Sequence, residues 1–184
     1  RVVISTLSDV YSALTAAIGS LRGPLHGGAN EEVMEMLTEI GSLEKVEPFV
    51  MDKLAHRAQG ARIMGFGHRV YKVIDPRATF LKTLAKQLAH DTGNQKLYDM
   101  SMKIEEIMAR EVSAKGIYPN VDFYSATTYH SIGLKLDLFT PMFAMSRISG
   151  WAGHIIEQLD GNRLYRPKAD YHGPHNAEYV AIDK

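Results

Sequence analysis

The chain has 184 residues, with 21 Lys plus Arg, 21 Asp plus Glu and no Cys. The balanced charge gives no basic field for nucleic acid, and the absence of Cys excludes disulfides, thiolate metal sites and a cysteine nucleophile. No apolar run reaches the roughly 18 residues of a membrane span. These features predict a cytoplasmic globular protein that binds neither nucleic acid nor a membrane.

In the first part of the chain, apolar residues spaced by three and four predict an amphipathic helix over residues 4–21. Gly23-Pro24 would end it. A glycine-rich turn that contains His26 follows and leads into a second helix. For this helix we predict Asn30 as the N-cap and Gly41 at the C-terminal cap.

The middle of the chain predicts three more helices. A short one covers residues 46–58, a second runs from Pro76 to a stop at Gly93, and a longer one follows around residues 97–112. Between the first and second lies a loop whose sequence is Gly65-Phe66-Gly67-His68. Its glycines allow a tight turn and a close approach to a ligand.

In the last third, a loop over residues 116–126 leads into a helix that fades near Gly133. Thr140-Pro141 would start the final long helix. The tail turns extended and basic, and residues 179–182 could form a short strand. The chain as a whole predicts an all-α fold of about seven helices.

Three loop-to-helix junctions each carry a group suited to proton chemistry: His26, His68 and Asp122. A carboxylate with two neutral imidazole donors suits removal of a proton next to a carbonyl group. The carboxylate takes the proton, one imidazole stabilises the enolate oxygen, and the other polarises the electrophile.

Three arginines could hold a substrate with more than one carboxylate: Arg77, Arg147 and Arg166. Arg77 would lie in the first turn of a helix with Asp75 as N-cap and Pro76 as first residue.

Simpler interpretations remain open for each residue taken alone. A histidine at a helix start is more often a cap or a surface residue, Asp122 could be only an N-cap, and Arg77 could be an ion-pair partner. The histidines have no metal-ligand spacing, so we predict no metal site. The glycine-rich loops match neither a dinucleotide-binding fingerprint nor a P-loop.

Three segments in this order resemble the motifs of the citrate synthase family: Gly23-Pro24-Leu25-His26-Gly27-Gly28-Ala29-Asn30, Gly65-Phe66-Gly67-His68 with Asp75-Pro76-Arg77, and Pro119-Asn120-Val121-Asp122. Ser146-Arg147 and Arg166-Pro167-Lys168 match two further arginines of the family. The resemblance covers essentially the whole chain and points to the shorter bacterial and archaeal enzymes.

The resemblance implies an acyltransferase of the tricarboxylic acid cycle that condenses acetyl-CoA with oxaloacetate, without a metal or prosthetic group. It implies that Asp122 is the base, that His26 donates to the thioester carbonyl, and that His68 polarises the oxaloacetate carbonyl. Arg77 and Arg147 would bind oxaloacetate carboxylates, and Arg166 would reach the partner subunit's site in a homodimer.

CoA would lie along Arg62, Ile63, Met64, Gly65, Phe66 and Gly67. The family pattern also implies a small domain over residues 28–133. Residues 1–27 and 134–184 would then belong to the large domain. The N-terminal half of the family pattern has no counterpart here, so we expect a C-terminal portion that is inactive alone.

Two rival functions stay open at this point. The first is 2-methylcitrate synthase, which uses propionyl-CoA, because one methylene is worth only about 1–3 kcal/mol of discrimination. The second is a non-catalytic helical module that binds ligands. Such a module needs no base, so the presence of Asp122 favours an enzyme.

Overall fold

The computed structural model describes residues 1–23 and 26–182, and all its regular elements in these ranges are helical, as expected. The α-helices are α1 (Val10–Leu21), α2 (Ala29–Ile40), α3 (Val46–Ala55), α4 (Pro76–Thr92), α5 (Gln95–Val112), α6 (Val121–Ser131) and α7 (Phe139–Leu159). Short 3₁₀ turns are η1 (Ile4–Thr6), η2 (Leu43–Lys45), η3 (Arg57–Gln59), η4 (Ser113–Lys115) and η5 (Leu136–Leu138).

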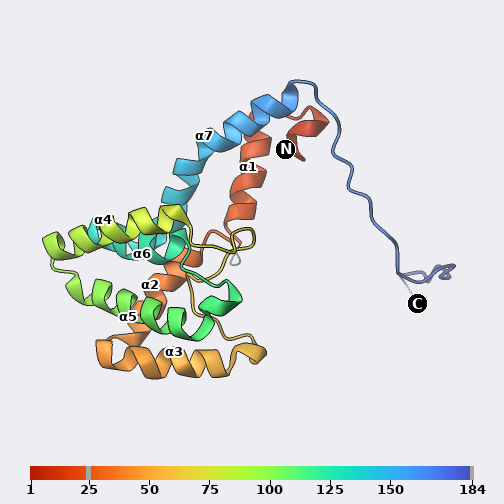
Figure 1. Cartoon of the computed structure of the whole chain (residues 1–184). Helices are drawn as coiled ribbons and strands as arrows, with labels where there is room; N and C mark the ends of the chain where they lie inside the picture. Colours follow the sequence, from red (N-terminus) through yellow and green to blue (C-terminus); the bar gives the residue numbers. More distant parts are fainter. Residues whose placement is uncertain (24–25, 183–184) are drawn as a thin grey trace.

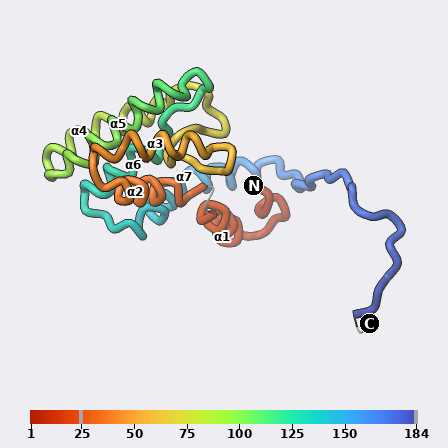
Figure 2. The backbone as a smooth tube through the Cα atoms, turned by 90° about the horizontal axis from the view of Figure 1, so that it is seen from below, coloured from red at the N-terminus to blue at the C-terminus, as the bar shows by residue number. Residues whose placement is uncertain are grey.

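The helices form two groups. Helices α2 to α6 make a compact bundle, while α1 and α7 pair with each other and project from it (Figure 1). The tail after α7 leaves both groups as an extended chain (Figure 2). None of the helices in the described residues is long and apolar enough to cross a membrane.

Helix α6 lies at the centre of the bundle, packed against α2, α4 and α5. Its residues Phe123 to Thr128 are all buried, and Phe123 and Tyr124 are almost fully so. Burying a large apolar side chain contributes about 1.5–3 kcal/mol. The start of α6, which carries Asp122, is therefore tied to the main hydrophobic core.

The α1–α7 pair has a much smaller core, formed by Ile4, Ala13 and Ile155. Several large apolar side chains of this pair are exposed: Tyr11 and Ile18 on α1, and Met145 and Ile156 on α7.

Two expectations for the first part of the chain are wrong. Residues 4–21 do not form one helix, because Leu7 is left-handed (φ 62°) and Asp9 starts α1 by accepting a hydrogen bond from the Ser12 amide. Asn30 is not an N-cap either, since α2 starts one residue earlier and Asn30 is buried in its first turn. Pro24, the expected helix stop, lies outside the described residues.

Other boundaries shift as well. The helix expected over residues 46–58 ends at Ala55 and continues as a 3₁₀ turn, and the last helix starts at Phe139 rather than Thr140. Residues 179–182 form no strand. Asp75 does cap α4, with Pro76 as its first residue, and Gly41 and Gly93 adopt the left-handed conformation that ends a helix.

Candidate active site

His26 lies in a tight turn between α1 and α2. Its amide donates to the Gly23 carbonyl oxygen at 2.9 Å, and the Gly27 amide donates to the Leu21 carbonyl oxygen at 2.8 Å. A Cβ on Gly27 would lie 2.2 Å from that same oxygen, so only glycine fits. This turn places His26 three residues before α2, at the positive end of the helix dipole.

The glycine loop before His68 is joined to the loop before Asp122. Phe66 and Pro119 form an antiparallel bridge. The Gly67 amide donates to the Tyr118 carbonyl oxygen, and the Asn120 amide donates to the Gly65 carbonyl oxygen, both at 2.9 Å. Two motifs far apart in sequence are thus paired along their backbones.

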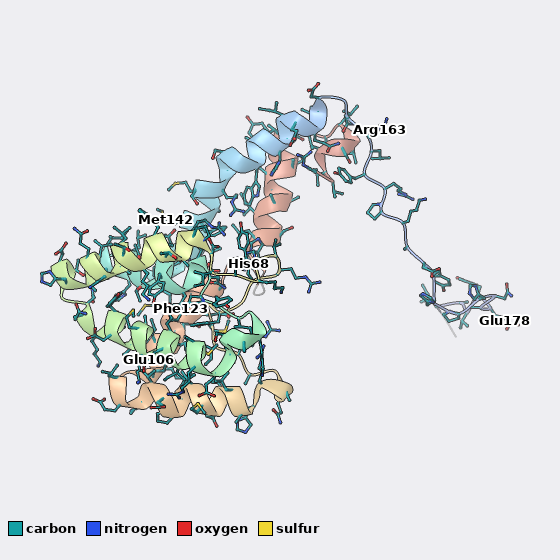
Figure 3. The ribbon with its side chains drawn as sticks, viewed as in Figure 1. His68, Glu106, Phe123, Met142, Arg163 and Glu178 are labelled. Atoms are coloured by element: carbon teal, nitrogen blue, oxygen red, sulfur yellow. The ribbon has the colours of Figure 1, made fainter. Side chains whose placement is uncertain are left out.

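Gly65 makes the closest approach between these segments. Its φ is +78°, and a Cβ there would lie 2.8 Å from both Phe123 Cα and Val33 Cγ2. The ring of Phe66 meets the ring of Phe123 edge-on, with centroids 4.7 Å apart. The loop is therefore pressed against α2 and α6, next to His68 (Figure 3).

The ring of His68 is oriented by its own loop. Its Nδ1 accepts hydrogen bonds from the backbone amides of Val70 at 3.1 Å and Tyr71 at 3.0 Å. A nitrogen that accepts carries no proton, so in the neutral ring the proton lies on Nε2. The ring also stacks on Tyr71, at 4.6 Å between centroids. In the neutral ring of His68, the Nε2–H group is therefore the one available to donate a hydrogen bond.

Arg77 is held by the residue that caps its helix. Its Nε donates to Asp75 Oδ1 at 3.1 Å, and its Nη2 donates to Asp75 Oδ2 at 2.7 Å. These bonds lower the pKa of Asp75. About half of the Arg77 side chain is exposed, so its remaining N–H groups are free to meet a ligand.

Asp122 is the second residue of α6, and Asn120 caps this helix by accepting from the Asp122 amide at 3.0 Å. Burial raises the pKa of Asp122, and the nearby charges of His26, Arg77 and His68 oppose that rise. The structure therefore brings these three side chains together around one carboxyl. A base with a raised pKa suits proton abstraction near neutral pH.

Arg147 and Arg166 differ in their placement. The guanidinium of Arg147 lies over the Phe143 ring at 4.9 Å, and that ring meets the His26 ring edge-on at 6.3 Å. Arg147 therefore lies on the His26 side of the site. Arg166 is exposed in the extended tail, beyond Arg163, which Figure 3 shows at the far end of α7 from His68. Within this chain Arg166 does not join the other candidates.

The run Arg62 to Gly67 lines an open cavity of about 1090 Å³ that also reaches His68 and Asn120. Three further basic residues line the same cavity: Lys53, Arg57 and Arg69. We did not single these out from the sequence, because Lys53 and Arg57 occur in a helical stretch where charged residues usually face solvent. No cluster of three potential metal ligands occurs in the part of the chain that the structure describes.

Comparison with known proteins gives a consistent result. Residues 1–168 match the family model described as the citrate synthase C-terminal domain. The chain is 58% identical over 184 residues to citrate synthase 2 of Bacillus subtilis and covers 48% of that protein. It is 44% identical over 182 residues to the 2-methylcitrate synthase of Shewanella oneidensis and covers 47% of it.

Solved structures agree with these relatives. A ternary complex of the Thermoplasma acidophilum citrate synthase with carboxymethyl coenzyme A and oxaloacetate aligns with a TM-score of 0.91 at 43% identity. It covers 99% of this chain, which spans 48% of that one. The Thermotoga maritima citrate synthase aligns with a TM-score of 0.87 at 46% identity, over 99% of this chain and 49% of its own. The chain thus spans about half the length of the curated relatives it matches.

Proposed function

Because the chain belongs to the citrate synthase family, we propose that its site serves the condensation of acetyl-CoA with oxaloacetate to citrate and CoA. The observation that carries the proposal is the half-buried Asp122 carboxyl, whose pKa is raised, with His26, His68 and Arg77 around it. One carboxylate and two imidazoles are enough to run this reaction with the acyl-CoA as co-substrate and no further cofactor.

In the proposed reaction Asp122 removes a proton from the acetyl methyl group, and His26 donates to the thioester oxygen, where negative charge develops. The enolic carbon then attacks the oxaloacetate ketone, whose oxygen receives a proton from His68 Nε2. Water finally hydrolyses the thioester and releases CoA. The tautomer of His68 supports its role, because Nδ1 is already occupied by two backbone donors. Each such donor contributes roughly 3–4 kcal/mol to the transition state.

Arg77 and Arg147 are proposed to hold the oxaloacetate carboxylates. The Asp75 carboxylate supports this for Arg77, because it fixes the guanidinium while leaving N–H groups free. Arg166 is proposed to act on the partner subunit's site in a homodimer. Its place in an extended, exposed tail supports that assignment.

CoA is proposed to lie in the cavity along residues 62–67. Lys53, Arg57, Arg62 and Arg69 give this cavity a positive lining suited to the phosphates of CoA. The sequence-based division into residues 1–27, 28–133 and 134–184 stays a proposal, supported by the separate cores of the bundle and of the α1–α7 pair. The cytoplasmic location also stays a prediction.

Propionyl-CoA is the second candidate substrate. The 58% identity to a citrate synthase, against 44% to a 2-methylcitrate synthase, favours acetyl-CoA. A purely binding module is disfavoured, because it would need no carboxyl whose pKa is raised beside two histidines.

The test is CoA release by the full-length gene product, measured as free thiol. We expect release only when oxaloacetate and an acyl-CoA are both present, with kcat/KM higher for acetyl-CoA than for propionyl-CoA. Release that does not depend on oxaloacetate would reject condensation. The 184-residue chain alone should turn over far more slowly, since it spans about half of its relatives.

A further inference from the structure

The start of α7 is capped by a residue from another helix. Leu138, the residue before α7, offers no side-chain hydrogen bond. Instead, the Glu31 carboxylate on α2 accepts from the Thr140 amide at 3.1 Å and from the Thr140 hydroxyl at 2.5 Å. The first amides of a helix need such partners, and a negative charge is favourable there. Glu31 thus fastens α2 to the first turn of α7.

The Thr140 hydroxyl has a second neighbour. It lies 2.9 Å from the Gly27 carbonyl oxygen, which belongs to the residue directly after His26. Its single hydrogen is therefore shared between the turn that carries His26 and the carboxylate that caps α7. This side chain connects α7, α2 and the His26 turn at one point.

The ring of His26 depends on this neighbourhood for its direction. His26 is exposed, and none of the hydrogen bonds in the described residues involves its ring. Thr140 and Phe143 lie on one face of α7, a single turn apart. Thr140 contacts the backbone of the His26 turn, while Phe143 meets the His26 ring edge-on. Helix α7 therefore contacts the His26 ring and the backbone of the residue that follows it.

We infer that Thr140 and Glu31 are positioning residues for His26, acting through the Gly27 carbonyl group. The inference rests on the proposed function, because it assigns them to the step in which His26 donates to the thioester oxygen. Helix α7 also carries Arg147. The Glu31–Thr140–Gly27 contact therefore fixes the position of His26 relative to α7, the helix whose Arg147 is proposed to bind oxaloacetate.

The experiment compares Thr140→Val and Thr140→Ser in the full-length gene product. Loss of one positioning hydrogen bond should lower kcat by about 3- to 10-fold, while the KM for oxaloacetate changes less than about twofold. Thr140→Ser keeps the hydroxyl and should restore kcat. Glu31→Gln keeps an acceptor oxygen, so its kcat should fall less than that of Glu31→Ala. Thr38→Val, which removes a hydroxyl bonded to the Met34 carbonyl elsewhere on α2, should leave kcat unchanged.

A double mutant separates positioning from a general structural effect. If Thr140 acts through His26, Thr140→Val should cost nothing further in a His26→Ala background, measured as washout of the acetyl-CoA methyl protons into D₂O. An equal loss in both backgrounds, or no loss in either, overturns the inference. If Thr140→Val does not fold, Glu31→Ala replaces it in the same double-mutant cycle with His26→Ala. An inactive wild-type protein would reject the proposed function as well, whereas an active one with an unaffected Thr140→Val variant rejects only this inference.

Discussion

The Asn120 side chain binds the carbonyl oxygen of Gly67, 53 residues earlier in the chain, at 2.9 Å from Nδ2. Its Oδ1 accepts from the Asp122 amide at 3.0 Å. One side chain therefore fixes both the backbone just before His68 and the first turn of the helix that carries Asp122. The relative placement of the proposed base and the proposed donor depends on this amide group.

Asn120→Ala should remove both hydrogen bonds at once. We expect a loss of about 1–3 kcal/mol in the free energy of unfolding, from the helix cap and the bond to Gly67 together. Urea denaturation of the full-length gene product measures it. Asn94→Ala is the matched control, since Asn94 precedes α5 without capping it. Equal losses in the two variants would show that the cap and the bridge to Gly67 together add nothing to stability.

Gly65→Ala and Gly67→Ala form a matched pair. Both glycines have positive φ, +78° and +84°, but only at Gly65 would a Cβ meet other atoms, at 2.8 Å from Phe123 and Val33. Gly67→Ala should cost about 1–2 kcal/mol for the left-handed backbone alone. Gly65→Ala should cost about 3 kcal/mol or more, because overpacking adds to that strain. Similar thermal unfolding shifts for the two variants would contradict the tight packing at Gly65.

Asp122→Asn should stabilise the protein at neutral pH. Burial raises the pKa of Asp122 above its ordinary value of 3.8, so the folded state favours the protonated carboxyl and its ionised form costs stability. The gain in the free energy of unfolding of Asp122→Asn over the wild type should be complete above the raised pKa of Asp122. It should shrink as the pH falls through that pKa and vanish below about pH 3.8. Urea denaturation as a function of pH tests this. A variant less stable than the wild type at neutral pH would contradict it.

Asp75→Asn should weaken the binding of oxaloacetate. Asparagine keeps the helix cap but loses the charged fork that orients Arg77, so the KM for oxaloacetate should rise with little change in kcat. The lowered pKa of Asp75 stabilises the fold above pH 3.8, and this contribution is lost as the pH falls through the lowered value. The exposed half of Arg77 limits the contribution to about 1 kcal/mol. A KM equal to that of the wild type would show that Asp75 does not contribute to oxaloacetate binding.

Much of the fold could be predicted because the sequence signals that start and end its helices lie next to the helices themselves. Asp75-Pro76 started a helix and Gly93 ended it as expected. Spacing could not show that Leu7 breaks the first helix, because a left-handed leucine has no local signal. It also could not show Glu31 capping a helix that begins 108 residues later, since that contact forms only after the chain has folded.

In the candidate site, too, some features have a local sequence signal and others depend on tertiary contacts. The types of residue at His26, His68 and Asp122 pointed to proton chemistry, and the structure brings them together. The sequence did not reveal the partners that orient them. Asn120 lay in a segment predicted to be a loop as far as residue 126, although α6 starts at Val121, and Thr140 was predicted only as a helix start. Their long-range bonds to Gly67 and Gly27 depend on tertiary contacts.

The most direct test of the account is condensation by Asp122→Asn in the full-length gene product, with oxaloacetate binding measured alongside by calorimetry. Removal of a general base should lower kcat by about 10²–10⁴-fold, while the Kd for oxaloacetate stays near that of the wild type. A variant that condenses acetyl-CoA with oxaloacetate at close to the wild-type rate would contradict the assignment of Asp122 as the base.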